Sequence, residues 1–181
     1  LEMPELIPGA LGVVSQSGTM LGALMSRGAA RGVGFSKMVS IGNEADLSVG
    51  EVGDALVDDP DTEAILLFLE SIRDAASLAS MARRAHKAGK PVIAYKLGRS
   101  DAGRALAISH SGAIAGDDAA ADAFFRDCGI LRVDLLETLL EIAPLARRRP
   151  KGPGRKVAVL TTTGGGAATT VDRMGLAGIE L

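Results

Sequence analysis

Two short segments of the sequence combine residue types that suit phosphate binding. Ser15-Gln16-Ser17-Gly18 and Thr163-Gly164-Gly165-Gly166 each stand between an apolar run and a helical pattern, so we expect two strand-to-helix turns. Free N–H groups and the positive end of the helix dipole favour an anion there, and the hydroxyls of Ser15 and Ser17 add donors. Ser and Gly also form ordinary N-caps and tight bends, so the residues alone leave both interpretations open.

The residue best suited to covalent chemistry is His110. It lies in Ser109-His110-Ser111-Gly112, a stretch of small residues that precedes a helix expected to begin at Asp117. This placement predicts an imidazole on a loop near one edge of the fold, although many loop histidines have no chemical role. The other histidine, His86, lies in a polar helical pattern and is expected to face solvent.

Glu70 follows the most hydrophobic run of the chain, Ile65 to Leu69. A carboxylate at the end of a strand can accept a hydrogen bond from an imidazole, fix its tautomer and stabilise its cationic form. It can equally cap the helix that follows. Gly42 to Asp46, after the preceding strand, could line the same edge, although Gly-Asn is also ordinary turn chemistry.

The elements that must position these residues alternate between short apolar runs and longer helical patterns, which is typical of parallel α/β construction. We expect strands at residues 11–15, 37–41, 64–69, 92–96 and 130–133, and helices at residues 18–32, 49–58, 75–88, 117–128 and 135–147. The run at 65–69 is apolar on both faces, as in a sheet covered by helices on both sides. The sequence therefore predicts a flavodoxin-like doubly wound parallel sheet.

A second α/β domain is expected to begin near the end of the sequence. Residues 149–155 are rich in charge, Pro and Gly and are predicted to link a first domain, residues 1–148, to a second that starts at 156–181. In this second part we expect a strand at 156–160, a helix at 164–174 and another strand from Ile179. Because residue 1 is not Met and the last residues resemble the start of a strand, we interpret the chain as a fragment.

The composition narrows the classes of function. The chain has 181 residues, 47% hydrophobic, 23% charged and 3% aromatic, with a formal net charge of −2, which fits a globular protein without a nucleic-acid surface. Cys128 is the only cysteine, so an intrachain disulfide is impossible and a reducing cytoplasm is expected. No ligand spacing for a metal is present. No apolar run approaches the roughly 20 residues that cross a membrane.

Together the motifs resemble the succinyl-CoA synthetase superfamily, in particular its ADP-forming acyl-CoA synthetase branch, over residues 9–181. The first Ser-Gly turn is similar to the opening of the family's first power helix, and Leu69-Glu70-Ser71-Ile72 to the strand end whose glutamate pairs with the active histidine. The His110 segment is similar to the phosphohistidine loop, commonly Ser-His-Thr-Gly. Thr163-Gly164-Gly165-Gly166 is similar to the start of the second power helix, where the family often has Asn-Ala-Gly-Gly.

The resemblance implies an acid-CoA ligase that forms ADP and works through a phosphohistidine. His110 would carry the phosphoryl group, Glu70 would orient it, and Ser15, Ser17, Gly18, Gly164, Gly165 and Gly166 would cradle phosphate. Substrates would be acyl-CoA or acyl phosphate, phosphate, CoA and ATP or ADP with Mg. A CoA-binding domain and an ATP-grasp domain would lie in the same chain or on another subunit, and a homo-oligomer is one arrangement that this allows. The isolated chain is then predicted to be inactive.

The main alternative is a flavodoxin-like domain that binds a ligand or a partner without catalysis, because fold alone does not decide function. Convergence of Glu70, His110 and the Ser15 turn at one edge would discriminate between the two. A true flavodoxin is disfavoured because none of the few aromatic residues falls in the candidate loops. A receiver domain is disfavoured because no acids cluster after the first strand.

Overall fold

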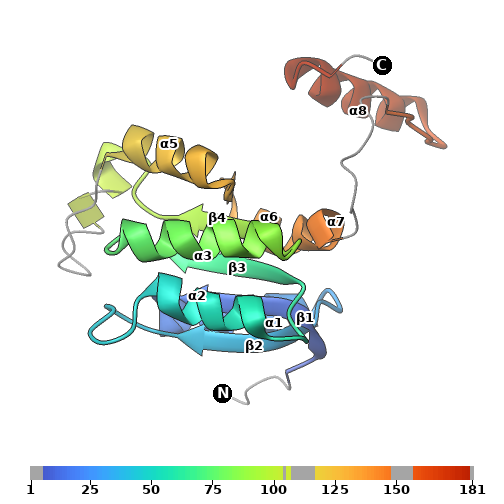
Figure 1. Ribbon diagram of the computed structural model, residues 1–181. Helices are drawn as coiled ribbons and strands as arrows, with labels where there is room; N and C mark the ends of the chain where they lie inside the picture. Colours follow the sequence, from blue (N-terminus) through green and yellow to red (C-terminus); the bar gives the residue numbers. More distant parts are fainter. Residues whose placement is uncertain (1–5, 104, 107–116, 148–156, 180–181) are drawn as a thin grey trace. The chain divides into compact units, whose positions relative to one another are not determined.

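The computed structural model describes residues 6–103, 105–106, 117–147 and 157–179 (Figure 1). The chain divides into two compact units, Leu1–Arg148 and Arg149–Leu181. Among the described residues, the first unit contains one parallel sheet of five strands in the order β2-β1-β3-β4-β5. The strands are β1 (Pro8–Ser15), β2 (Phe35–Ser40), β3 (Ala64–Leu69), β4 (Val92–Lys96) and β5 (Leu131–Val133). This order confirms the flavodoxin-like doubly wound sheet predicted from the sequence.

Helices cover both faces of the sheet. They are α1 (Gly18–Ala29), α2 (Val49–Asp58), α3 (Ala75–Lys87), α5 (Asp118–Cys128), α6 (Leu136–Glu141) and α7 (Ala143–Arg147). One apolar core lies between the sheet and α2, α3 and α5, and the other between the sheet and α1, α6 and α7. Strand β3 contributes to both: Ile65 and Leu67 face the first core, and Leu66 and Phe68 the second. Its burial on both faces explains why this run has no polar alternation.

The helices of the first core begin at side chains that bind their free N–H groups. Ser48 and Glu51 form a capping box at α2, with Glu51 Oε2 accepting from the Ser48 backbone N–H at 2.8 Å. Asp74 caps α3 and Asp117 caps α5. At the other end of α5, Gly129 has φ +71, the left-handed conformation that glycine adopts without steric cost. These caps fix where each helix starts relative to the strand before it.

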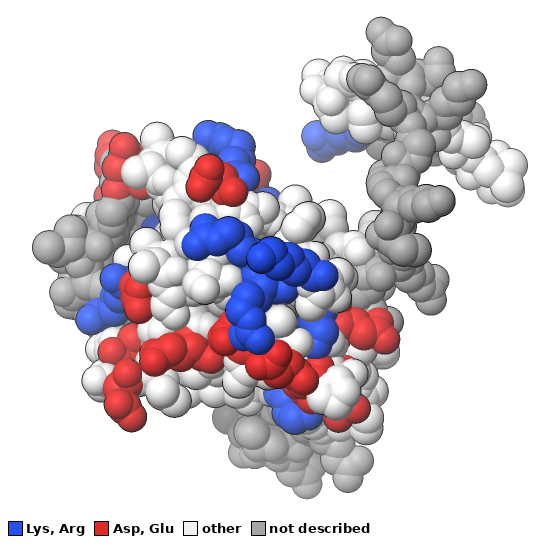
Figure 2. Space-filling view, in the orientation of Figure 1, with Lys and Arg blue, Asp and Glu red and all other residues white. Residues whose placement is uncertain are grey.

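Figure 2 shows basic and acidic side chains side by side over the face formed by α2 and α3. There Arg84 of α3 pairs with Asp54 and Asp58 of α2. All three side chains are 40% exposed or more, so water and salt screen these pairs and each contributes little to stability.

Three expectations about the elements were wrong. The helix expected at 135–147 is two short helices, α6 and α7, because Pro144 has no N–H to continue the helical hydrogen bonding. The helix expected at 18–32 ends at Ala29, ahead of Gly32 with φ +64. Finally, residues 157–160 are not in a strand, whereas the strand expected from Ile179 runs into residues 180–181, which lie outside the described residues. A strand needs a neighbour, and the described part of the second unit offers only one helix, α8 (Gly164–Leu176).

No helix in the described ranges is long and apolar enough to span a membrane. The same residues also contain no cluster of three or more His, Cys, Asp or Glu side chains that could hold a metal ion.

Candidate active site

The turn after β1 is shaped by its own serines. Ser15 is fully buried, and its Oγ accepts a hydrogen bond from the Ser17 N–H at 3.1 Å and donates to the Ser17 carbonyl at 2.7 Å. Ser17 in turn caps α1, with its Oγ accepting from the Met20 N–H at 3.3 Å. The structure therefore uses the Ser15 hydroxyl inside the turn, whereas Ser17 lies at the open end of the helix.

The turn before α8 repeats this hydrogen-bond pattern. Thr161 Oγ1 accepts from the Thr163 N–H at 3.3 Å and donates to the Thr163 carbonyl at 3.2 Å, and Thr163 Oγ1 accepts from the Gly166 N–H at 3.1 Å. A Cβ on Gly166 would lie 2.8 Å from both threonine hydroxyls, so a larger residue there would displace the side chains that form this pattern. Gly164 and Gly165 face open space and leave the start of the helix bare.

A pocket of about 590 Å³ opens beside the first turn, on the face of the sheet that α1 and α6 cover. It is lined by Ser17, Thr19, Met20, Phe68, Glu70, Tyr95, Leu97, Gly98, Gly103, Leu106 and Leu136. Most of the lining comes from the carboxyl ends of β3 and β4 and the start of α1. In doubly wound sheets, ligands bind at this edge, where the strand order reverses between β1 and β3. The pocket has both polar groups and an apolar floor, as small-molecule sites do.

The pocket has both polar and apolar lining residues. Ser17, Thr19 and Glu70 supply hydroxyl and carboxyl groups. Phe68 and Tyr95, which stack on each other with ring centroids 5.6 Å apart, supply aromatic surface. Two predicted site residues, Ser17 and Glu70, are thus brought to one cavity, although they come from different strand ends. Ser15 and Gly18 are not among its lining residues.

Gln16 is a residue of this edge that the sequence-based assignment did not include. Its side chain is buried and crosses to the end of β3, where Oε1 accepts from the backbone N–H groups of Glu70 at 2.5 Å and Ser71 at 3.0 Å. Its Nε2 donates to the Ser71 carbonyl at 3.0 Å and to Glu44 Oε1. The turn sequence contained Gln16, but only the pairing of β1 with β3 shows what it reaches.

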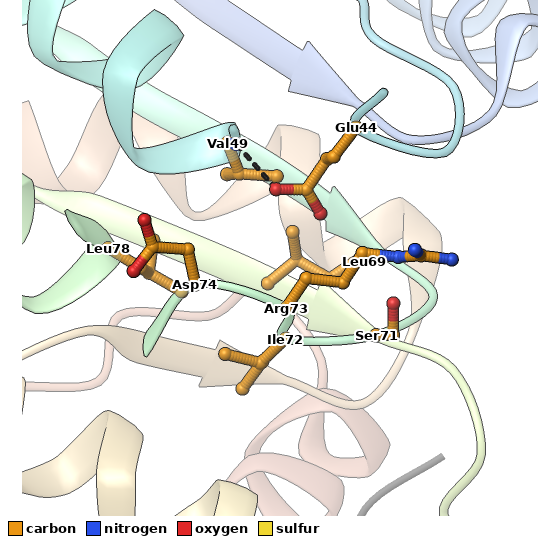
Figure 3. A pocket seen from close by; sticks show the side chains of 8 residues that line it. All are labelled: Glu44, Val49, Leu69, Ser71, Ile72, Arg73, Asp74 and Leu78. Carbon is orange, nitrogen blue, oxygen red and sulfur yellow. Dashed lines mark hydrogen bonds between the residues drawn. The ribbon is translucent and has the colours of Figure 1, made fainter. Parts of the chain in front are cut away.

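Glu44, after β2, completes this set of contacts. Figure 3 shows its carboxylate beside the start of α2, where Oε2 accepts from the Val49 N–H at 2.9 Å. Glu44 has φ +54, the left-handed region that a residue with a side chain adopts at a cost of about 1 kcal/mol. The hollow around Glu44, Ser71 and Arg73 has no volume open to a ligand. Residues 42–46 were expected to line this edge of the sheet, and among them Glu44 accepts a hydrogen bond from the side chain of Gln16.

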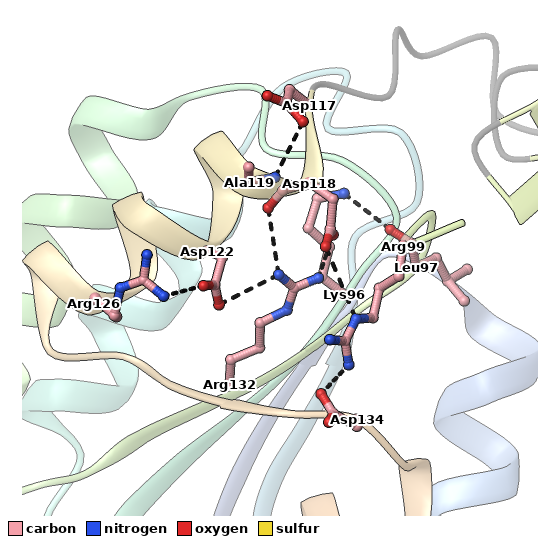
Figure 4. A network of polar contacts seen from close by, with 10 residues as sticks. All are labelled: Lys96, Leu97, Arg99, Asp117, Asp118, Ala119, Asp122, Arg126, Arg132 and Asp134. Atoms are coloured by element: carbon pink, nitrogen blue, oxygen red, sulfur yellow. Dashed lines mark hydrogen bonds and ion pairs between the residues drawn. The ribbon is translucent and has the colours of Figure 1, made fainter. Parts of the chain in front are cut away.

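Ion pairs hold the chain on both sides of residues 107–116. Figure 4 shows Arg99, which follows β4, paired with Asp134, while Arg99 Nε lies 3.9 Å from Asp118 Oδ2 at the start of α5. Asp118 also pairs with Arg132 of β5, whose side chain is only 8% exposed. The hydrogen bond from Arg132 is the main reason that the pKa of Asp118 is lowered. Residues 99 and 118 are therefore fixed to the same edge of the sheet.

His110, the predicted phosphoryl carrier, lies outside the described residues. Leu106, four positions before it, lines the pocket, and so does Gly98 at the start of the same connection. His86 lies on the exposed side of α3, as expected.

The fold and the pocket define a doubly wound α/β domain with a ligand-sized cavity at its strand-order reversal. A sequence profile of the family described as succinyl-CoA ligase like flavodoxin domain matches residues 8–146. The chain belongs to this family.

Curated relatives carry acid-CoA ligase names. The chain is 34% identical over 164 residues to "Acetate--CoA ligase [ADP-forming]" of Methanocaldococcus jannaschii, covering 91% of this chain and 23% of the relative. It is 39% identical over 155 residues to "Trans-feruloyl-CoA synthase FCS1" of an unknown prokaryotic organism, covering 86% of this chain and 22% of the relative. The chain thus spans about a quarter of the length of these two relatives.

A solved structure is also similar over nearly the whole chain. It is the dinucleotide forming acetyl-coenzyme A synthetase 1 of Candidatus Korarchaeum cryptofilum in complex with phosphate and ADP. The TM-score is 0.88 and the sequence identity 31%, covering 98% of this chain and 38% of the other.

Proposed function

We propose that this domain carries the phosphohistidine of an ADP-forming acyl-CoA synthetase, with His110 as the phosphorylated residue. The observation that carries the proposal is that Ser17 and Glu70 line one pocket, to which Gly98 and Leu106 of the connection that contains His110 also contribute. The names of the relatives support the acid-CoA ligase class. The whole enzyme would interconvert acyl-CoA, ADP and phosphate with a carboxylic acid, CoA and ATP.

The reaction would proceed in three balanced steps. Phosphate attacks the thioester carbonyl of acyl-CoA, the C–S bond breaks, and acyl phosphate and CoA are formed. A nitrogen of His110 then attacks the phosphorus of acyl phosphate, which releases the carboxylate and leaves phosphohistidine. Finally, a terminal oxygen of ADP takes the phosphoryl group, which forms ATP and returns the imidazole to its neutral form.

Glu70 would act as the orienting partner of His110. A neutral imidazole is the nucleophile, and it becomes cationic as its nitrogen bonds to phosphorus. An adjacent carboxylate aims the ring and balances that developing charge. Glu70 suits this role because it lines the pocket. Its backbone is also held in place, since the Glu70 N–H donates to the side chain of Gln16.

The turns before α1 and before α8 would bind phosphoryl oxygens, each by its own helix start. At α1 the pocket exposes Ser17 and Thr19, and at α8 the glycines at 164 and 165 leave backbone N–H groups accessible. Backbone donors and a helix dipole stabilise negative charge without a bound cation. Ser15 and Gly18 would contribute through the shape of the first turn, and Gly166 through that of the second.

The remaining parts of the reaction would lie on other domains. CoA would bind a CoA-binding domain, and ADP or ATP, as its Mg complex, an ATP-grasp domain, either in the same chain or on another subunit. A reducing cytoplasm suits the single cysteine, Cys128, whose thiol is buried and has a raised pKa because of that burial.

Turnover assays test the proposal. The complete enzyme that contains this domain is expected to form ATP from acyl-CoA, ADP and phosphate, whereas residues 1–181 alone are expected to form none. A complete enzyme that releases acid and CoA without making ATP contradicts the ligase assignment. Turnover by residues 1–181 alone contradicts the division of the reaction among domains.

The alternative, a flavodoxin-like domain that binds without catalysis, would keep the pocket and use Ser17 and Glu70 only for recognition. It predicts that replacing His110 leaves turnover of the complete enzyme unchanged.

A further inference from the structure

The side-chain amide of Gln16 has its hydrogen-bonding capacity filled at the edge of the sheet. A glutamine amide offers two acceptor sites on oxygen and two N–H donors. Oε1 accepts from the N–H groups of Glu70 and Ser71, and Nε2 donates to the Ser71 carbonyl and Glu44. All four partners belong to the segments that follow β2 and β3. Gln16 therefore joins three strand ends through one buried side chain.

This amide takes the place of backbone that has left the sheet. The ladder between β1 and β3 pairs Ser15 with Phe68, and the Gln16 N–H adds a last bond to the Phe68 carbonyl at 3.1 Å. Beyond this point the chain turns into α1, so no β1 backbone remains beside Glu70. A buried backbone N–H without an acceptor costs free energy. The side-chain oxygen of Gln16, Oε1, is the acceptor for the Glu70 N–H. The backbone of Glu70 is thereby held as if the strand continued.

A neutral amide is the side chain that the surroundings require. Gln16 lies between the carboxylate of Glu44 and the backbone of Glu70, and it must both donate and accept. A carboxylate of the same size could accept from the two N–H groups, but it would repel Glu44 and the Ser71 carbonyl. An apolar residue of similar size would leave the Glu70 N–H unpaired.

We propose that Gln16 is the positioning residue that sets the geometry of Glu70 toward His110, with Glu44 holding the amide in its correct orientation. The inference rests on the proposed function, because Gln16 acts through Glu70 and is not among the residues that line the pocket. Glu44 is itself fixed by the Val49 N–H, so the start of α2 braces the contact. A displacement of about 1 Å at a reacting group can slow chemistry roughly 100-fold.

The test uses the complete enzyme with Q16M, Q16E and the unchanged residue. Transfer of label from γ-labelled ATP to His110 is measured in a single turnover, together with KM for nucleotide and CoA. We expect Q16M to slow labelling about 100-fold with both KM values unchanged. We expect the rate of Q16E relative to the unchanged enzyme to rise as pH falls, because protonation of the carboxyl group in this variant removes its negative charge and restores one of the two donors of the amide.

S36A is the matched control for loss of stability. Ser36 Oγ and Thr62 Oγ1 share a hydrogen bond of 2.6 Å at the opposite end of the sheet, far along β2 and β3 from the pocket. We expect S36A to lower the melting temperature while labelling of His110 keeps its rate.

The outcomes distinguish failure of the role of Gln16 from failure of the proposed function. Three results would each overturn the role of Gln16 and leave the phosphohistidine in place. The first is labelling of Q16M at the unchanged rate, and the second is an equal loss of labelling rate in S36A and Q16M at equal melting temperature. The third is a labelling rate of Q16E, relative to the unchanged enzyme, that does not vary with pH. Absence of label at His110 in the unchanged enzyme overturns the proposed function and this inference with it.

Discussion

Ser17 and Glu70 line one pocket although each follows a different strand of the sheet. Ser17 comes two residues after the end of β1, and Glu70 directly follows β3, the strand that pairs with β1 in parallel. The carboxyl ends of parallel neighbours meet at the same edge, which brings a helix start and a carboxylate together. Substitutions at Glu70 and Ser17 therefore test whether this pocket binds and transfers phosphate.

Replacing the Glu70 carboxylate by an amide should slow phosphoryl transfer without unfolding the domain. E70Q keeps the size of the side chain but loses the charge that stabilises a cationic imidazole. We expect labelling of His110 to fall by about 100-fold or more, the range typical of a lost acid–base partner. Rapid-quench labelling measures the rate. D61N, an exposed acid before β3, is the control and should label normally; equal rates in E70Q and the unchanged enzyme contradict the orienting role.

Comparison of two helix caps, Ser17 of α1 and Ser48 of α2, distinguishes an effect on phosphate binding from an effect on stability. S17A and S48A each remove an N-cap, of α1 and of α2, and should each cost about 1 kcal/mol in the free energy of unfolding measured with urea. Only Ser17 lines the pocket. We therefore expect KM for phosphate to rise in S17A and to stay unchanged in S48A. A similar KM in both variants would remove Ser17 from the phosphate site.

The contact between Asp118 and Arg132 should make stability depend on pH. Because the pKa of Asp118 is lowered in the folded state, its contribution is present above the ordinary carboxyl pKa, 3.8, and is lost as pH falls through the lower folded value. We expect D118N to lose about 2 kcal/mol in the free energy of unfolding at pH 7, since the buried guanidinium of Arg132 loses a charged partner. Below the folded pKa of Asp118 the two proteins should converge.

The matched control for this pair is D58N. Asp58 pairs with Arg84 on the surface, where the aspartate is 70% exposed, and its loss should cost less than about 1 kcal/mol at any pH. Urea titrations of the three proteins at pH 7 and at acid pH make the comparison. A constant difference between D118N and the unchanged protein across this range contradicts the assigned pKa direction.

Alanine substitutions at two glycines in the first turn of α8 should act in opposite directions on helix stability. A Cβ at Gly166 meets the Thr161 and Thr163 hydroxyls at 2.8 Å, so G166A should break the cap and lower helix stability by about 1 kcal/mol. A Cβ at Gly165 meets nothing, and alanine favours a helix over glycine by up to about 1 kcal/mol. Circular dichroism during urea unfolding distinguishes them. Equal effects of the two changes would contradict the cap geometry.

The sequence predicted the doubly wound parallel class and the burial of both faces of the sheet, because alternating strand and helix patterns and an apolar strand without polar alternation indicate them. Residues 65–69 are apolar without alternation, and that pattern occurs in a central parallel strand. The break at Pro144 was missed because apolar spacing continues across it from α6 to α7. A proline that lacks an N–H should have outweighed that periodicity.

The site was predicted only in part, for a physical reason. Ser17 and Glu70 follow strands, so their convergence could be inferred from topology. The contact of Gln16 with Glu70 depends on a side chain that reaches across to a neighbouring strand. The contact of Arg99 with Asp118 joins the segment after β4 to the start of α5. Neither partner choice is encoded in residue type or spacing.

Labelling of the complete enzyme with γ-labelled ATP decides whether His110 carries the phosphoryl group. Phosphohistidine is labile in acid and stable in base, so the account predicts acid-labile label on the enzyme that is absent from H110N. Acid-labile label that persists in H110N would contradict the assignment of His110 as the phosphoryl carrier.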